Sequence, residues 1–341
     1  MRAWLIVIVA GCSFNARNGI IVDTNSSDTS GGGGDGSGSG SGSGDAAWWD
    51  TSWQTRFPIA IANGSSDPLP AGFQVGLPFD VAAAACASAT PLHDDIRVVF
   101  GGSADLPRVI DLVGPPAWTW FRLAAPIAGG ATSTGDYFVY CNNPAAPAAS
   151  ADPATVFDFF DDFDGTTLGS AWTPTGTVLV GGGLITCGAF PQSGVASTTQ
   201  YAAAGVAMDF VGAPAGANNF WWGGFQNTAD SQPWLIWYGD QDTQFRFFPS
   251  VANGQISVGS AFSPGIVPHL YGVEDYGNSM MWRLDDTPYF AQTEAGLPTT
   301  QTLRLWNGQS NTNSTVAFDS VRVRQAIAPP PAATAGSAEA R

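Results

Sequence analysis

The chain has 341 residues and an acidic balance, with 28 Asp and Glu against 12 basic residues and a formal net charge of −16. Nucleic-acid binding needs clustered Lys or Arg to displace counterions, so this balance excludes a nucleic-acid partner. An anionic membrane surface would also repel the chain, and beyond residue 12 no apolar run approaches the about 20 residues of a membrane-spanning helix. The length allows two ordinary domains, and 13 Trp among 44% hydrophobic residues can fill their cores.

The first dozen residues carry an export signal. A charged start is followed by the short apolar run 3–10 and then by Gly11-Cys12. This pattern resembles a bacterial lipoprotein signal, which implies that Cys12 becomes the lipidated N-terminus and that residues 1–12 hold the signal peptide and lipidation site. The alternative is an ordinary secretory signal or a misassigned start, because the apolar run is short for the usual ~7–15 residues. Ser13 after the cysteine favours, by analogy with Gram-negative sorting, the outer membrane.

Residues 13–46 form a tether. Residues 23–45 are almost wholly Ser, Gly, Asp, Thr and Asn, a composition that cannot bury enough apolar area to offset the entropy lost on ordering. Such a chain behaves as a flexible coil. The expected protein is therefore a lipid-anchored component of the cell envelope that is attached to the membrane only through its anchor.

Residues 47–147 predict an antiparallel β-sandwich. Apolar residues alternate at Phe57, Ile59 and Ile61, as in a strand with one buried face, and Gly, Pro, Asn and Asp pairs mark the turns. A single helical turn over residues 82–86 is the one helix expected in this half. The expected strand segments are 56–62, 73–77, 95–100, 118–123 and 136–140.

Spaced motifs in this half resemble a bacterial family named domain of unknown function 2341. The motifs are Trp48-Trp49-Asp50, Trp53, Arg56, Asp94-Asp95-Ile96-Arg97, Trp118 and the closing run 137–144. The resemblance covers about residues 47–150 and implies no activity and no functional residues. Family members often precede a lectin-like sandwich in exported proteins. Cys141 stands where the family commonly has Gly. Compared with the family, this departure indicates a local disulfide.

The remaining cysteines are sparse. Cys86 and Cys141 lie in the same predicted domain and form the favoured disulfide pair, while Cys187 is expected to be a buried small hydrophobic residue. The alternative, held equal, is that all three are buried thiols. No C-x-x-C motif occurs and the histidines are only His93 and His269, so a zinc or redox site has no ligand set.

Residues 155–327 predict a second all-β sandwich. Polar and apolar residues alternate through many short runs without a helical period. The opening Phe-Asp pattern of residues 156–165, a hairpin at residues 282–286 and the last Asp-x-Val-x-Val strand resemble a concanavalin A-like jelly roll of the lectin and glucanase superfamily. An Ala-Pro linker at residues 144–153 separates the halves. The tail 328–341 is expected to be disordered.

No catalytic residues are expected. A retaining glucanase on this fold needs two carboxylates about 5–5.5 Å apart, and the chain has only Glu274, Glu294 and Glu339 without an E-x-D-x-x-E pattern. Glu274 and Asp275 are neighbours, so in a strand they point to opposite faces. The expectation is therefore a protein that is not an enzyme. A divergent glycan hydrolase that uses an Asp pair such as Asp285-Asp286 is the alternative, although that pair fits a hairpin turn better.

No cofactor or metal is expected. One acidic cluster has oxygen ligands of the kind Ca²⁺ prefers, but its spacing does not match an EF-hand loop. The acidic cluster is better explained as solvated turn residues between core Phe side chains. The alternative is that Ca²⁺ binds the cluster and stabilises the loop. The cluster consists of Asp158, Asp161, Asp162 and Asp164.

Aromatic residues in the second half are the candidate binding site. Sugar rings pack their C–H faces on exposed Trp and Tyr rings, with polar neighbours such as Gln226 taking the hydroxyls. The consecutive Trp221-Trp222 is the strongest candidate, because adjacent strand residues cannot both face one core. The expected function is a carbohydrate-binding or adhesive surface with a polysaccharide as its partner, and an envelope scaffold that contacts other proteins is the alternative. The candidate ligand-binding residues are Trp221, Trp222, Trp237, Tyr238 and Trp282.

Overall fold

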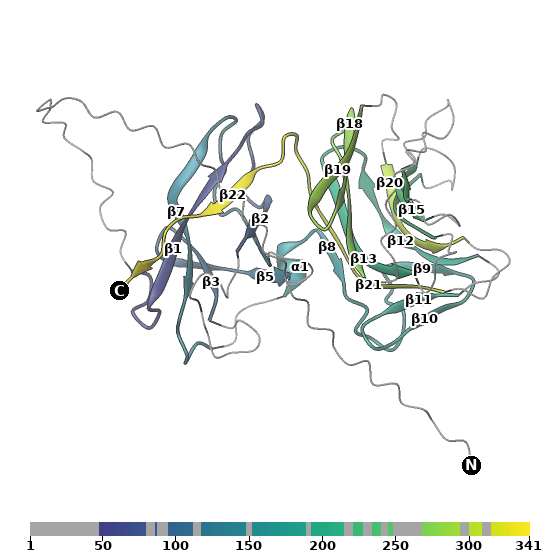
Figure 1. Ribbon diagram of the computed structural model, residues 1–341, viewed down its shortest axis with the longest axis horizontal. Helices are drawn as coiled ribbons and strands as arrows, with labels where there is room; N and C mark the ends of the chain where they lie inside the picture. The colour runs from purple at the N-terminus through teal and green to yellow at the C-terminus, as the bar shows by residue number, and fades with distance from the viewer. Residues whose placement is uncertain are drawn as a thin grey trace, which may run out of the picture. The chain divides into compact units, whose positions relative to one another are not determined.

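The computed structural model is an almost entirely β structure (Figure 1). It describes residues 48–79, 86, 95–111, 117–147, 152–188, 192–214, 221–227, 234–239, 245–247, 268–293, 300–308 and 315–341. These residues belong to one unit, Asp45–Arg341. The single helix within the described ranges is the short α1 (Pro153–Val156), capped by Asp152, and none of the described helices is long and apolar enough to cross a membrane. The anchor, the tether and the helical turn at 82–85 lie outside the described residues.

The first sandwich places a six-stranded sheet against a three-stranded one. The larger sheet has the order β22-β1-β7-β3-β4, with β23 also paired to β1, and the smaller has the order β2-β6-β5. Its core contains Phe57, Ile59 and Ile61, the three residues whose alternation predicts this strand. The strands first met here are β1 (Thr55–Ala62), β2 (Gln74–Pro78), β3 (Arg97–Phe100), β4 (Ala104–Leu106), β5 (Arg108–Asp111), β6 (Trp118–Arg122) and β7 (Thr132–Cys141).

The end of the chain completes this sandwich. Strands β22 (Ala332–Ala335) and β23 (Glu339–Ala340) pair antiparallel with β1, and Ala333 is buried in the core beside it. Figure 1 shows this yellow segment against the purple β1. The expectation of a disordered tail at residues 328–341 is therefore wrong. Pro-Ala composition carries no strand signal, because the pairing depends on a partner more than 260 residues away in the chain.

The second sandwich packs an eight-stranded sheet on a six-stranded sheet. The orders are β10-β11-β21-β13-β17-β18-β19, with β8 on β21, and β16-β15-β14-β20-β12-β9. The eight-stranded sheet is built of β8 (Phe159–Asp161), β10 (Val178–Val180), β11 (Ile185–Cys187), β13 (Val206–Pro214), β17 (His269–Asp275), β18 (Ser279–Leu284), β19 (Thr287–Thr293) and β21 (Val316–Gln325). The six-stranded sheet is built of β9 (Trp172–Thr175), β12 (Ser193–Ala202), β14 (Trp221–Gln226), β15 (Trp234–Gly239), β16 (Phe245–Phe247) and β20 (Thr300–Asn307).

The core of the second sandwich lies between these two sheets. Phe210 of β13, Phe225 of β14, Tyr271 of β17 and Phe318 of β21 are all fully buried in it. Cys187 is buried there as expected, and burial raises the pKa of its thiol to about 12. The predicted fold class is confirmed: an all-β chain with two antiparallel sandwiches, the second a jelly roll.

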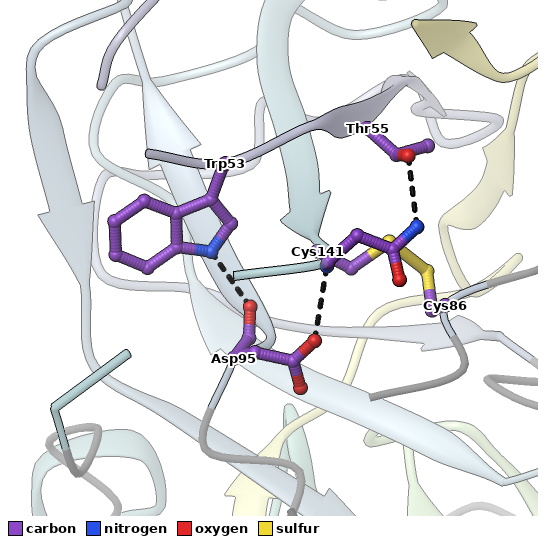
Figure 2. Close-up of a disulfide and its surroundings, with 6 residues drawn as sticks. Trp53, Thr55, Cys86, Asp95 and Cys141 are labelled. Carbon is purple, nitrogen blue, oxygen red and sulfur yellow. Dashed lines mark hydrogen bonds between the residues drawn. A yellow bond between two sulfur atoms is a disulfide. The ribbon is translucent and has the colours of Figure 1, made fainter. Parts of the chain in front are cut away.

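The tryptophan motif at the start of the first sandwich has a structural role (Figure 2). The Trp53 indole Nε1 donates to the Asp95 carbonyl at 2.7 Å, and a carboxylate oxygen of Asp95 accepts from the Asn142 backbone N–H at 3.0 Å. Cys86 and Cys141 form a disulfide next to this network, which agrees with the favoured pairing. Asn142 has φ 63°, a conformation that Asn tolerates well. These hydrogen bonds therefore hold together the segment before β1, the segment before β3 and the segment after β7.

Candidate functional site

The tryptophans of the second half divide between the core and the outer face of the six-stranded sheet. Three of the five candidates face inward: Trp221, Trp237 and Trp282 are at most 2% exposed and belong to the core. The Trp237 indole donates to the Gly272 carbonyl at 2.8 Å, across the sandwich. These three rings pack the two sheets together, which corrects the expectation that they contact a ligand. The side chain of Tyr238 lies outside the described residues.

Trp222 is the candidate that points outward. It alternates with Trp221 on β14 and lies opposite Trp306 of β20 in the sheet register. The two rings stack with centroids 5.9 Å apart and an interplanar angle of 21°, and Trp222 is partly exposed. The Arg304 guanidinium, on the same side of β20, lies 5.5 Å from the Trp306 ring centre. We call this surface, made of Trp222, Gln226, Arg304 and Trp306, the Trp222 face.

Two glycines make room for the rings of the Trp222 face. A Cβ on Gly194 of β12 would lie 2.4 Å from a Trp306 ring carbon, and one on Gly308 would lie 2.1 Å from a Trp222 ring carbon. Both distances are far below van der Waals contact, so any larger residue at either position would displace a ring. The sequence offers glycines next to aromatic strands, but only the sheet register shows which ring each one accommodates.

Gln226 lies on the same side of β14 as Trp222, because residues four apart on a strand share a face. Its side chain is 1% exposed, and neither its amide nitrogen nor its amide oxygen makes a hydrogen bond to any residue that the structure describes. A buried polar group left in this state costs about 1–3 kcal/mol. The Trp222 face therefore carries an unused donor and acceptor beside a pair of aromatic rings.

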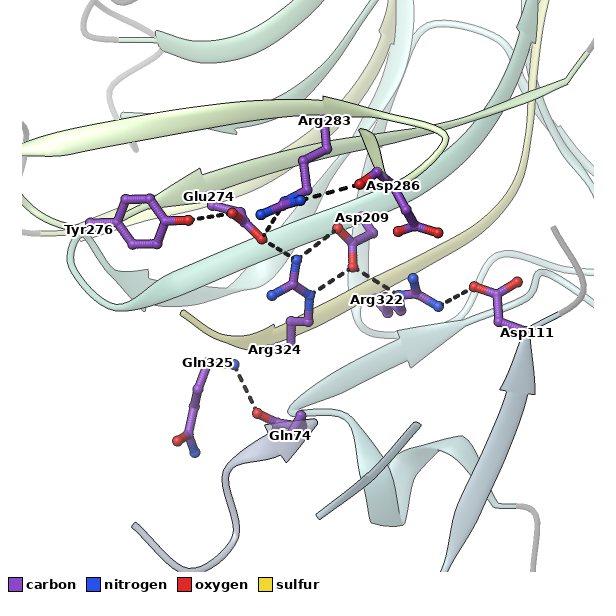
Figure 3. Close-up of polar contacts among 10 residues, drawn as sticks. All are labelled: Gln74, Asp111, Asp209, Glu274, Tyr276, Arg283, Asp286, Arg322, Arg324 and Gln325. Carbon is purple, nitrogen blue, oxygen red and sulfur yellow. Dashed lines mark hydrogen bonds and ion pairs between the residues drawn. The ribbon is translucent and has the colours of Figure 1, made fainter. Parts of the chain in front are cut away.

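The outer face of the other, eight-stranded sheet carries a charged cluster (Figure 3). Asp209 of β13 accepts from the Nε atoms of Arg322 and Arg324 of β21 at 2.9 and 3.0 Å. Arg324 also binds Glu274 of β17, and Arg322 reaches Asp111 of the first sandwich. Burial by itself raises the pKa of the Asp209 carboxyl. The positive charges of Arg324 and Arg322 outweigh this effect and lower the pKa to about 2.

Glu274 has further partners in the charged cluster. The Arg283 Nε lies 3.0 Å from its carboxylate, and the Tyr276 hydroxyl donates to it. Burial works against the charge, but Arg324 and Arg283 together lower the pKa of Glu274. The neighbouring Asp275 faces the other way and contacts Gln301, as the alternation predicts. Glu274 is thus held ionised by arginines.

Asp285 and Asp286 form the β18–β19 turn, as predicted, with φ values of 47° and 61°. The carboxyl of Asp286 makes no hydrogen bond to any described residue, and burial and then Asp209 raise its pKa to about 6. Asp285 differs, because it pairs with His269 at 2.7 Å and accepts from the Leu270 N–H. His269 therefore has a structural partner, and His93 lies outside the described residues.

Asp286→Asn is expected to raise the free energy of unfolding at pH 7 by up to about 2 kcal/mol. The folded-state pKa of Asp286 is raised above its ordinary value of 3.8, so the wild type loses stability as the pH rises from about 4 through 6. Below that window both forms are neutral and the difference disappears. Asn also tolerates the left-handed φ of this position. Urea unfolding at pH 3.5 and pH 7 measures the effect.

Asp285→Asn is the matched control, because it has the same turn geometry but removes a stabilising ion pair with His269. It is expected to lower stability at pH 7. Equal effects of the two substitutions would contradict the assignment of an uncompensated charge to Asp286.

The acidic cluster that follows the linker is used within the fold. Asp161 accepts from the Trp172 indole at 2.7 Å and from the Phe163 N–H at 2.8 Å. Asp158 pairs with Arg122 of the first sandwich at 2.8 Å. Among the residues described, no three His, Cys, Asp or Glu side chains are grouped to hold a metal ion. The expectation of no metal, with a calcium-steadied loop at Asp158, Asp161, Asp162 and Asp164 as the alternative, stays a prediction.

A family model described as domain of unknown function (DUF2341) matches residues 94–175. This confirms the resemblance over residues 94–150, while the match begins after the first tryptophan motif and continues through β9 of the second sandwich. No curated protein matches the sequence.

Several solved structures share the fold with half of this chain. One, described as "Prominent members of the human gut microbiota express endo-acting O-glycanases to initiate mucin breakdown", is 15% identical, with 50% of this chain and 99% of that chain covered and a TM-score of 0.42. The Crh5 transglycosylase is 17% identical; the match covers 50% of this chain and 85% of that chain, with a TM-score of 0.39. The Bacillus licheniformis β-glucanase is 18% identical; the match covers 49% of this chain and 97% of that chain, with a TM-score of 0.38.

The expectation that this chain is not an enzyme is contradicted by these structures, since they include glycosidases and a transglycosylase. That expectation is therefore withdrawn. At 15–18% identity the likeness concerns the fold, and the reactions are those of the other proteins.

Proposed function

We propose that the second sandwich binds a polysaccharide or other glycan on the Trp222 face. The observation that carries this proposal is the combination of the partly exposed Trp222 ring, stacked on the buried Trp306, with the buried Gln226 amide, which has no hydrogen-bond partner among the described residues. The partly exposed Trp222 indole, supported by the buried Trp306, offers a flat apolar surface to the C–H face of a sugar ring. The amide supplies both a donor and an acceptor for ring hydroxyls, and bonding to a ligand would remove the cost of leaving them unpaired.

Trp222→Ala is expected to weaken retention on the best glycan of a broad polysaccharide screen by about tenfold or more, because one face of the stacked pair is lost. Affinity electrophoresis of the full-length protein through immobilised polysaccharides measures it. Trp222→Phe keeps an aromatic ring and is expected to retain part of the binding.

The matched control is Trp49→Ala, which removes a partly exposed indole from the first sandwich. It is expected to leave retention of the polymer unchanged. A screen with no retained glycan, or equal losses for Trp222→Ala and Trp49→Ala, would contradict the proposal.

We further propose that Cys12 carries the acyl chains that hold the protein at the cell envelope, in the outer membrane of a Gram-negative bacterium. Support comes from the charged start, the apolar run and Gly11-Cys12-Ser13. The mature protein is expected to begin at lipidated Cys12, and Cys12→Ser to prevent lipidation. Intact-mass analysis of protein from a membrane fraction tests this, with Cys187→Ser as a control that keeps the lipid. An unmodified Cys12 would contradict the proposal.

A further inference from the structure

A cavity of about 300 Å³ lies between the first sandwich and the outer face of the eight-stranded sheet. Strands β2 and β6 line one side of it, and the β17–β18 strands with their turns line the other. The tail closes a third side through Pro330 and Pro331 on its way to β22. The volume is at the small end of the about 300–1,000 Å³ typical of small-molecule sites, so the cavity suits one ring-sized ligand.

The wall from the first sandwich is aromatic. Trp118 and Trp120 share a face of β6 and stack with centroids 6.0 Å apart at 25°. Gly76 of β2 permits this, because a Cβ there would lie 2.9 Å from both rings. Trp120 is buried, with the Arg322 guanidinium 4.7 Å from its ring centre. Trp118 stays partly exposed, so the cavity has one firmly supported indole ring with a free surface.

The opposite wall is polar and fixed in position. The Arg283 Nε lies 3.0 Å from Glu274, and its Nη1 donates to the Asp286 carbonyl at 3.2 Å. Figure 3 shows Arg283 between Glu274 and Asp286, with an interaction to each. The Asp286 carboxylate lines the cavity and accepts no hydrogen bond from any described residue. The Asp286 carboxylate is therefore placed to accept a hydrogen bond from a ligand.

We propose that this cavity is a second binding site, for one neutral pyranose ring that stacks on Trp118 and donates a hydroxyl to Asp286. An aromatic ring facing a fixed carboxylate and a guanidinium matches the alternation of C–H and hydroxyl groups on a sugar. Four carboxylates of the wider cluster face three guanidinium groups, which disfavours an anionic ligand. The site is independent of the Trp222 face, because it lies on the opposite sheet of the sandwich.

Ligand-detected NMR titration of the full-length protein tests the proposal. The probes are the methyl glycosides of glucose, galactose, mannose and N-acetylglucosamine, with methyl glucuronide as the charged comparison. At least one neutral glycoside is expected to bind saturably. Trp118→Ala is expected to weaken it about tenfold, and Asp286→Asn by a similar factor, since a charged acceptor is lost.

Two further variants keep the outcome interpretable. Asp286→Asn is expected to fold more stably than the wild type at pH 7, so a loss of binding there is not a loss of structure. Trp222→Ala is expected to leave glycoside binding unchanged, which separates this site from the proposed polysaccharide face. Absence of saturable binding, binding unaffected by both cavity variants, preference for the glucuronide, or loss in Trp222→Ala would each overturn the proposal.

Discussion

Removing residues 328–341 is expected to unfold the first sandwich while the second stays folded. The truncation deletes β22 and β23, which cover β1 through the pairs from Ile59↔Ala335 to Ala62↔Ala332 and from Thr55↔Ala340 to Arg56↔Glu339. It also removes Ala333 from the core. The core of the second sandwich contains no residue beyond Val323 and loses nothing.

The expected loss is roughly 4–6 kcal/mol, from about 0.5–1.5 kcal/mol for each net backbone hydrogen bond and the exposure of an edge. That is comparable with the entire stability of a domain, about 5–15 kcal/mol. Denaturant unfolding followed by tryptophan fluorescence is expected to show two transitions in the truncated chain, with the first moved to low denaturant.

A synthetic peptide of residues 328–341 serves as the control. Added to the truncated chain, it is expected to restore the first transition, whereas the same peptide with Ala333→Asp is not, because a charge would enter the core. A truncated chain that unfolds like the intact protein would show that the tail strands are dispensable.

Arg324→Met is expected to destabilise the second sandwich by about 3–5 kcal/mol at pH 7, because it leaves the buried carboxylates of Asp209 and Glu274 without their shared partner. Urea unfolding at pH 7 measures the loss. Arg122→Met is the matched control, since the Arg122–Asp158 pair is about one-third exposed and such pairs contribute up to about 1 kcal/mol.

The loss in Arg324→Met is also expected to depend on pH. In the wild type the pKa of Asp209 is lowered from 3.8 to about 2, so its contribution is complete above about pH 4 and disappears as the pH falls through 2. This contribution amounts to roughly 2 kcal/mol. Without Arg324 the two carboxylates take up protons at higher pH, so the deficit should be smaller at pH 4 than at pH 7. A deficit that is equal at both values, or as small as that of Arg122→Met, would contradict this account of the cluster.

The alternation of apolar residues is enough to predict the strands and both sandwiches, because a half-buried strand imposes a period of two whatever its partners are. Phe57, Ile59 and Ile61 show this directly, since all three enter the core. The tail strands escaped prediction for the opposite reason. An edge strand of Ala and Thr has no period of its own and forms only against β1.

The candidate site was predicted in part by the same rule. Alternation correctly required one of Trp221 and Trp222 to leave the core, but it could not say which of the isolated tryptophans did so. Trp237 and Trp282 proved to be buried, and Trp306 became a partner of Trp222 only through the register of β14 on β20. The charged cluster was likewise hidden, because Asp209, Glu274 and Arg324 lie far apart in sequence.

The indole N–H signals of the tryptophans offer the most direct test of glycan binding on the Trp222 face. The full-length protein is titrated with an oligosaccharide fragment of its best-retained polysaccharide, and the signals are assigned by single Trp→Phe substitutions. The Trp222 and Trp306 signals are expected to shift with saturation, while those of the buried Trp237 and Trp282 stay in place. Saturable binding that leaves Trp222 and Trp306 unmoved would contradict the account.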